Sequence, residues 1–98
     1  MRNGYHGDTI GAVAVGGIDV FHAEFGPLLF ETIQVSYPYP YRFPGSPEEC
    51  AAACLAEVEA VLGERAGEIA CLAVEPLVQA AGGFVLMPPG FLSDLVAL

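Results

Sequence analysis

The sequence predicts an α/β fold, and two neighbouring stretches carry this prediction. Residues 47–65 place apolar side chains at helical spacing behind a capped start, and residues 69–76 form a continuous apolar run that ends in Glu-Pro. A short apolar run of this kind is typical of a strand that is buried on both faces of a parallel sheet. A helix that leads into such a strand is the crossover unit of α/β proteins.

The N-terminal third is expected to hold a short helix and a short strand. Residues 9–15 favour a helix with Asp8 as its N-cap and Gly16-Gly17 at its end, and a strand over the same residues is the alternative. The aromatic residues and the Gly-Pro step within residues 18–30 indicate a loop with a short helical turn. Residues 31–36, "ETIQVS", alternate well enough for a short strand.

A proline-rich connector leads into the main helix. Residues 37–47 contain four prolines, which can continue neither a helix nor a strand. Ser46 as N-cap, Pro47 as the first helical residue and Glu49 as the third form a capping box. Gly67 is expected to end this helix. Its apolar stripe is expected at Cys50, Cys54, Val58 and Val61.

The C-terminal third should contain the buried strand over residues 69–76 and two smaller elements. Residues 83–90, "GFVLMPPG", predict a short extended piece and a turn. Residues 90–98, "GFLSDLVAL", look like the first two turns of a helix.

The chain is apolar for its size. Its 98 residues make one domain at most, yet 54% of them are hydrophobic and the mean hydropathy is +0.53. A chain of this length buries only about two-thirds of the surface that it exposes when unfolded. We therefore expect exposed apolar patches, which usually mark interfaces.

Charge argues against several classes of partner. Twelve acidic residues face three arginines and no lysine, which gives a net charge of −9. Such a surface repels phosphate, so neither nucleic acid nor an anionic membrane is an expected partner. No apolar run reaches the ~18 residues of a membrane span, and the N-terminal residues do not resemble a signal peptide. We expect a cytoplasmic protein whose three cysteines are reduced.

The sequence gives little support for a metal site or for a catalytic nucleophile. Cys50 and Cys54 share a helix face, but that face is also the apolar stripe, which favours buried thiols over a zinc site. A Cys-His nucleophilic pair with His6 or His22 has no local support. No dinucleotide-binding glycine motif is present, and a Walker A loop would need a lysine.

Two features remain open to a functional and a structural interpretation. Glu75 lies at the end of the predicted buried strand, where α/β folds place ligands, or it is the solvated end of that strand. Tyr5, His6 and Gly7 could hold a planar heteroaromatic ligand by ring stacking, close backbone approach and an imidazole hydrogen bond. Alternatively they form a polar turn with a satisfied surface histidine.

The stretch "GYHGDTIGAVAVGGIDVFHAEFGPLLFETIQV" closely resembles the class III aminotransferases, and "PYPYRFPG" and "AVEPLVQAAGGFVLMPPGFL" continue the resemblance in order. Within that class the chain is similar to enzymes of biotin synthesis. These convert 8-amino-7-oxononanoate to 7,8-diaminononanoate with S-adenosylmethionine or lysine as amino donor. The resemblance implies a partial large domain of a type I pyridoxal-phosphate (PLP) enzyme, with a mostly parallel sheet. It implies that residues 1–98 are a single internal fragment of this PLP-binding domain and that the enzyme is a homodimer.

The same resemblance implies roles for individual residues. Tyr5 would stack on the PLP ring and border the substrate, and His6 and Gly7 would complete the cofactor-facing turn. Asp8 would help to shape the substrate site by pairing with an arginine from a later segment. Glu75 would lie close behind the cofactor.

The resemblance also implies that part of the machinery lies outside these 98 residues. The family's Schiff-base lysine, its aspartate at the pyridine nitrogen and its Gly-Ser phosphate loop have no counterpart here, and the chain contains no lysine. We therefore expect the chain to be inactive alone. Ala80 stands where the family usually has glycine. The second hypothesis is a noncatalytic α/β association module, or one half of a split enzyme that a second fragment complements.

Overall fold

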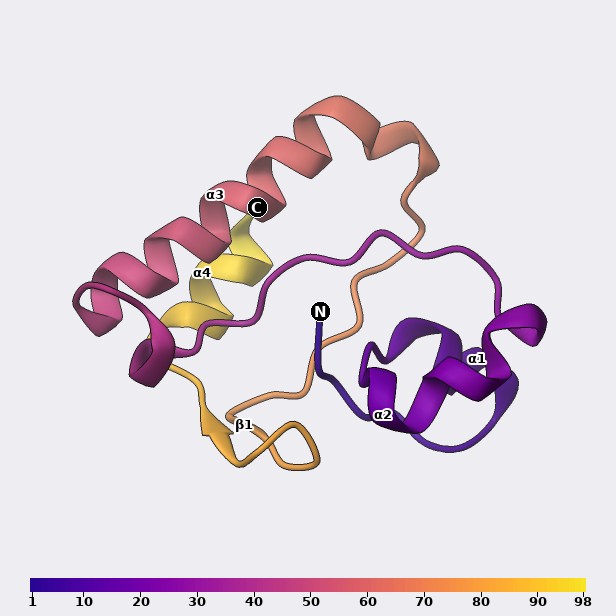
Figure 1. The fold of residues 1–98 in the computed structure, drawn as a ribbon. Coiled ribbons are helices and arrows are strands. Elements are labelled where there is room, and N and C mark those ends of the chain that lie inside the picture. Colours follow the sequence, from indigo (N-terminus) through magenta and orange to yellow (C-terminus); the bar gives the residue numbers. More distant parts are fainter.

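The computed structural model describes residues 1–98, and one long helix dominates it (Figure 1). Helix α3 spans Pro47–Arg65, with Ser46 as N-cap. The Ser46 hydroxyl accepts a hydrogen bond from the Glu49 amide, and the Glu49 carboxylate accepts one from the Ser46 amide, at 3.1 and 2.7 Å. The predicted capping box is confirmed, because the amides of Ser46 and Glu49 both find partners.

The helix ends slightly before the predicted glycine. A short 3-10 turn, η3 (Ala66–Glu68), follows Arg65 directly, so Gly67 lies inside that turn and does not cap α3. The Arg65 guanidinium donates to the Glu68 carboxylate at 2.6 Å and 3.2 Å, which favours the turn over a glycine stop.

The N-terminal third contains more helix than expected. Helix α1 spans Ile10–Val15 and ends at Gly16, as predicted, but its N-cap is Thr9, not Asp8. The Thr9 hydroxyl accepts from the Ala12 amide at 3.4 Å. Asp8 is engaged elsewhere, because its carboxylate accepts a hydrogen bond from Tyr5. Residues 18–30, predicted as a loop with a short helical turn, hold α2 (Asp19–His22) and the 3-10 helix η1 (Ala23–Leu28), so the helical part is longer than predicted.

The connector follows the prediction, with one addition. The 3-10 turn η2 (Pro40–Arg42) interrupts an otherwise extended chain, and Pro40 begins it. Proline suits this position because the first residues of a helical turn need no amide donor.

The strands predicted over 31–36 and 69–76 are wrong at the level of secondary structure. Both segments are extended, but neither pairs with another strand in this chain. The run over 69–76 is half-buried to exposed, not buried on both faces. Apolar patterning indicates that a segment can enter a sheet, whereas a strand exists only when a neighbour supplies the ladder hydrogen bonds.

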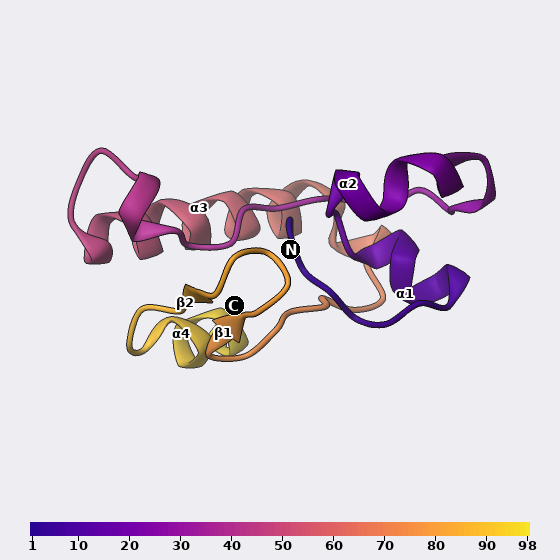
Figure 2. The ribbon, with the colours of Figure 1, turned by 60° about the horizontal axis from the view of Figure 1, so that its bottom comes forward.

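The C-terminal part forms a small hairpin and a helix. Strands β1 (Val78–Gln79) and β2 (Val85–Leu86) are antiparallel, and Val78 lies opposite Leu86. Helix α4 (Phe91–Ala97) follows, as the "GFLSDLVAL" pattern predicts. It packs on α3, and Figure 2 shows α4 and the hairpin together beneath α3, with α1 and α2 towards the other end.

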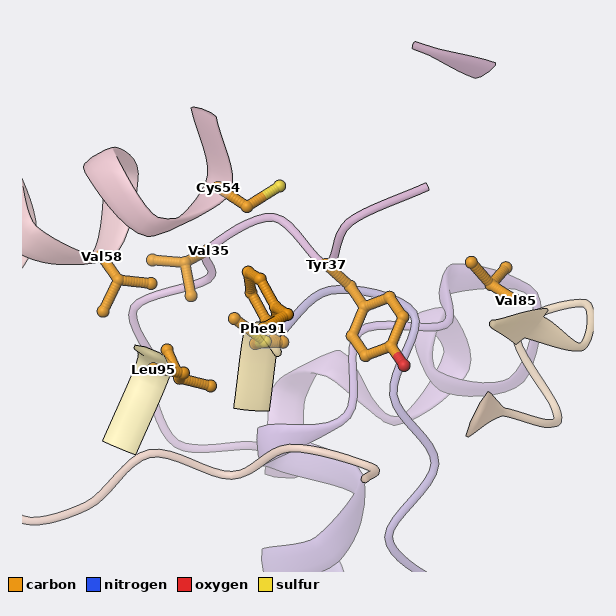
Figure 3. Packing of buried hydrophobic residues seen from close by; sticks show 8 residues of the cluster. Val35, Tyr37, Cys54, Val58, Val85, Phe91 and Leu95 are labelled. Carbon is orange, nitrogen blue, oxygen red and sulfur yellow. The ribbon is translucent and has the colours of Figure 1, made fainter. Parts of the chain in front are cut away.

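The core forms where α3, α4 and the extended segment around Val35 meet. Phe91, at 1% exposed, and Leu95 come from α4, and Cys54 and Val58 come from the apolar stripe of α3. Figure 3 shows these side chains together with Val35, Tyr37 and Val85, which belong to the same cluster.

The exposed apolar surface is also as expected. Val20, Phe84 and Val96 are each about 80% exposed. None of the helices combines the length and the hydropathy that a membrane-spanning helix requires.

Candidate functional site

Glu75 joins two segments that are seventy residues apart in the sequence. Its carboxylate accepts hydrogen bonds from the backbone amide of Tyr5 at 2.7 Å and from that of Ala80 at 3.1 Å. Leu77 adopts a left-handed conformation, with φ of 66°, which helps to turn the chain so that Ala80 returns to Glu75. Glu75 therefore does not end a strand in solvent. It anchors the Tyr5 segment to the turn that follows Pro76.

Tyr5 and Asp8 form a second local contact. The Tyr5 hydroxyl donates a hydrogen bond to the Asp8 carboxylate at 2.8 Å. Gly7 between them has φ of +116°, a conformation that an L-residue with a Cβ rarely adopts. The bond to Asp8, and secondarily desolvation and the carboxylate charge, raise the pKa of Tyr5. The tyrosine therefore stays protonated at neutral pH, and the residue is 38% exposed beside the turn.

His6 is half-buried, and its Nε2 atom is buried without a hydrogen-bond partner. A Cβ at Gly4 would lie 2.8 Å from this nitrogen, so the glycine leaves room for the ring. The interpretation of a satisfied surface histidine is therefore wrong. The Nε2 atom is covered by protein atoms, so it does not face an open ligand site.

Gln79 is a residue of this region that sequence reasoning missed. It is 2% exposed, and its side-chain amide donates to the Arg2 carbonyl at 2.7 Å. Gly82 supports the same packing, because a Cβ there would lie 2.5 Å from the Asn3 carbonyl oxygen. The sequence feature that could have indicated its role is the polar side chain at the end of the "EPLVQ" motif, residues 75–79. Together Glu75 and Gln79 hold residues 1–5 at two points.

The remaining chemical candidates have structural roles. The Nδ1 atom of His22 accepts from the amides of Gly17 and Ile18, each at 3.3 Å, which closes the turn before α2. Cys50 and Cys54 are buried in α3, whereas Cys71 is exposed, and all three are free thiols. No group of three His, Cys, Asp or Glu side chains is placed to hold a metal ion.

Comparison with known proteins identifies the family. The family model described as "Aminotransferase class-III" matches residues 1–98. Adenosylmethionine-8-amino-7-oxononanoate aminotransferase of Geobacter sulfurreducens is 55% identical over 98 residues, and the proteins of the same name from Staphylococcus aureus and Nitratidesulfovibrio vulgaris are 48% and 46% identical. The match covers 97% or more of this chain and 22%, 22% and 18% of those relatives. The chain thus spans about a fifth of their length.

Solved structures agree with this identification. An amine transaminase from an uncultivated Pseudomonas species, in a PLP-bound form, superposes with a TM-score of 0.86 at 37% identity, over 96% of this chain and 22% of its own. The Methanocaldococcus jannaschii adenosylmethionine-8-amino-7-oxononanoate aminotransferase superposes with a TM-score of 0.77 at 31% identity, over 99% of this chain and 20% of its own. These matches confirm the predicted fold class, a partial α/β domain of a type I PLP enzyme. The chain belongs to the class III aminotransferases.

Proposed function

We propose that residues 1–98 are one segment of the PLP-binding large domain of an aminotransferase that converts 8-amino-7-oxononanoate to 7,8-diaminononanoate in biotin synthesis. The amino donor is S-adenosylmethionine or lysine, and the working enzyme is a cytoplasmic homodimer. The names of the relatives support the substrates, since each is called adenosylmethionine-8-amino-7-oxononanoate aminotransferase.

The hydrogen bond between the Tyr5 amide and Glu75, at 2.7 Å, is the observation that carries this proposal. It joins two residues that the family resemblance assigns to the cofactor pocket from opposite ends of the sequence. The Glu75 carboxylate accepts a hydrogen bond from the backbone amide of Tyr5, and it therefore fixes the main chain at this residue. The Tyr5 ring is thereby positioned and stays free to contact a ligand. In the proposed roles, Tyr5, His6, Gly7 and Glu75 face the cofactor, and Tyr5 and Asp8 border the substrate.

The residues present fit one wall of a PLP site. Tyr5 offers an exposed ring for stacking on the planar ring of the cofactor. When bound, PLP supplies the electron sink for amino-group transfer. The chain has no lysine, and its N-terminal amine donates to the Ala73 carbonyl at 2.9 Å. The role of this chain is therefore to bind and orient, and the covalent step needs residues from elsewhere.

A chimera tests this function. Residues 1–98 replace the matched stretch of the Geobacter sulfurreducens relative, and the product 7,8-diaminononanoate is measured. We expect activity in the chimera and a loss of about fivefold in kcat/KM when Tyr5 is changed to alanine, because stacking contributes about 1 kcal/mol. Tyr41→Ala is the matched control, since Tyr41 is 85% exposed and distant in sequence from the pocket. A folded chimera that binds PLP without forming product contradicts the proposal.

Alone, the chain is expected to be inactive. We expect no imine absorbance with PLP at a side chain, and no borohydride-stable adduct there, because no lysine is available. Mass spectrometry of a peptide digest locates any adduct. A stable adduct on a side chain contradicts the expectation.

The second candidate function is association, either as a noncatalytic module or as the complementing half of a split enzyme. An apolar groove of about 500 Å³ beside α3, lined mainly by hydrophobic side chains, favours it. Co-expression with a polypeptide that carries the rest of the relative's sequence tests it. Restored transamination supports a split enzyme, and the absence of any interaction argues against association.

A further inference from the structure

The imidazole of His22 holds the turn that precedes α2. Its Nδ1 atom accepts hydrogen bonds from the backbone amides of Gly17 and Ile18, each at 3.3 Å, and the residue is 9% exposed. Ile18 is the N-cap of α2, and its apolar side chain can accept no hydrogen bond. A Cβ at Gly16 would lie 2.5 Å from the Cε1 atom of His22, so the ring packs directly against this turn. The imidazole therefore fixes the backbone of residues 16–18.

This arrangement requires one protonation state of the ring. A ring nitrogen that accepts hydrogen bonds carries no hydrogen, so Nδ1 is unprotonated and Nε2 carries the hydrogen of a neutral imidazole. A proton on Nδ1 would place an N–H group opposite two amide N–H groups, and both hydrogen bonds would be lost. Histidine is the side chain that ordinarily gains its proton between about pH 8 and pH 5. The turn over residues 16–18 is therefore sensitive to protonation of His22.

No charged partner would compensate for that proton. The only ion pair of the structure joins Arg65 to Glu68, and the imidazole of His22 makes no hydrogen bond other than the two with backbone amides. The segments around the ring carry ionisable side chains at Asp19, Glu24, Glu31, Arg2 and His6. Since no carboxylate among them lies within 4 Å of an imidazole nitrogen, an imidazolium at this position loses two amide hydrogen bonds and gains no salt bridge.

The same turn supports the residues that precede Tyr5. The Asn3 amide donates a hydrogen bond to the Gly17 carbonyl at 3.2 Å. A Cβ at Gly16 would lie 3.0 Å from the carbonyl oxygen of Gly4, so the two backbones are in close contact there. The turn is thus a third support of residues 1–5, besides the two side-chain hydrogen bonds from residues 75 and 79.

We propose that His22 is a positioning residue for residues 1–5, and that it acts only while its Nδ1 atom carries no proton. At acidic pH the imidazolium releases the turn over residues 16–18, and the Asn3 amide loses its partner. The Tyr5 ring is unchanged chemically, but its backbone is less firmly held. The consequence for catalysis rests on the proposed function, in which Tyr5 stacks on the PLP ring.

The first test measures the wild-type chain of 98 residues by NMR. The ¹⁵N shifts of the His22 ring at pH 8 should show an unprotonated Nδ1 atom and a protonated Nε2 atom. Hydrogen exchange of the Gly17, Ile18 and Asn3 amides, expressed as protection factors that remove the intrinsic effect of pH, follows the turn. We expect protection of all three to be at least about tenfold lower at pH 5 than at pH 8, while the Val58 amide inside α3 changes little.

Two variants assign the effect to the ring nitrogen. In His22→Asn the Oδ1 atom is an uncharged acceptor as close to the backbone as Nδ1, whereas His22→Phe keeps a ring without an acceptor. We expect the Asn variant to hold the three amides equally at both pH values, and the Phe variant to hold them poorly at both. Constant protection in wild type, an equal loss in the Asn variant, full protection in the Phe variant or the opposite tautomer overturns the proposal.

The second test uses the chimera with the Geobacter sulfurreducens relative. The ratio of kcat/KM in His22→Asn to that in wild type should rise by at least about fivefold as the pH falls from 8 to 5.5, because only wild type loses its support. A constant ratio, or loss of protection at Gly17 and Ile18 without Asn3, refutes the role in positioning Tyr5. The exchange measurements need neither PLP nor product, so an inactive chimera with the expected exchange is a failure of the proposed function alone.

Discussion

Gln79 gives the sharpest test of how the N-terminal segment is held. Its side chain is 2% exposed, and the Nε2 atom donates to the Arg2 carbonyl at 2.7 Å. In the variant Gln79→Glu the side chain keeps nearly the same shape, but at neutral pH a carboxylate oxygen faces the carbonyl oxygen. In Gln79→Met the side chain also keeps its length, and the donor is lost without a new charge.

The expected magnitudes differ between the two variants. Loss of a buried hydrogen bond with its partner left unpaired costs about 1–3 kcal/mol, so we expect about 1–2 kcal/mol for Gln79→Met. A buried carboxylate opposite a carbonyl adds an uncompensated charge, so we expect about 3 kcal/mol for Gln79→Glu at pH 7. For a domain of this size, that corresponds to a fall in Tm of about 12–24 °C.

Thermal unfolding followed by circular dichroism at pH 7 and pH 4 checks these values. Protonation of the introduced carboxyl group restores a donor towards the Arg2 carbonyl, so the Gln79→Glu variant should recover stability relative to wild type as the pH falls. The gap between Gln79→Met and wild type should not change in this way. If Gln79→Glu is as stable as wild type at pH 7, the hydrogen bond to Arg2 does not hold the segment.

Three further predictions concern the helix cap, the thiols and a buried tyrosine. Ser46→Ala should lower the free energy of unfolding by about 1 kcal/mol in urea titration, because the capping box loses its hydroxyl, and an unchanged midpoint argues against the cap. At pH 8 a thiol reagent should label exposed Cys71 well before buried Cys54. Burial, and secondarily neighbouring Cys50, raises the pKa of Cys54 to about 11, so little of its thiol is ionised at that pH. Equal labelling rates would contradict this prediction. Burial, and secondarily the charge of a nearby glutamate, raises the pKa of Tyr37 from 10.0 to about 12. As the pH rises, Tyr37 therefore ionises in the unfolded chain before it does so in the folded chain. The free energy of unfolding should fall between pH 10 and 12. Tyr37→Phe should remove that part of the loss of stability at alkaline pH. It should leave the stability at pH 7 equal or higher, because the buried hydroxyl has no hydrogen-bond partner. An unchanged pH profile would show that Tyr37 is not the group responsible.

The sequence predicts best where the controlling interactions are local. The start of α3 follows from Ser46, Pro47 and Glu49 alone, because all partners of the cap lie within four residues. The apolar stripe of α3 follows equally from spacing, and Cys50, Cys54 and Val58 are buried as expected. Prediction of the site residues rested on motif resemblance, and the contact between Tyr5 and Glu75 brings two of them together.

Sequence reasoning fails where the outcome depends on distant partners. Asp8 and Thr9 are both acceptable caps for α1, and the choice is made by Tyr5, whose hydroxyl engages Asp8. The apolar run over 69–76 has the composition of a buried strand, but composition does not supply a neighbouring strand. The importance of Gln79 was equally hidden, since its partner Arg2 is 77 positions away.

The contact between Met1 and Ala73 makes the N-terminus a natural reporter. In a polypeptide of these 98 residues, which has no lysine, the ammonium of Met1 is the one primary amine; it is hydrogen-bonded, and the residue is 4% exposed. An amine-acylating reagent can therefore modify a single atom. It does so only when residues 1–5 leave their place between the segments around Val35 and Ala73, whose carbonyls accept hydrogen bonds from Arg2 and Met1. The rate of acylation at Met1 thus measures how often residues 1–5 detach from the rest of the chain, with no mutation and no introduced probe.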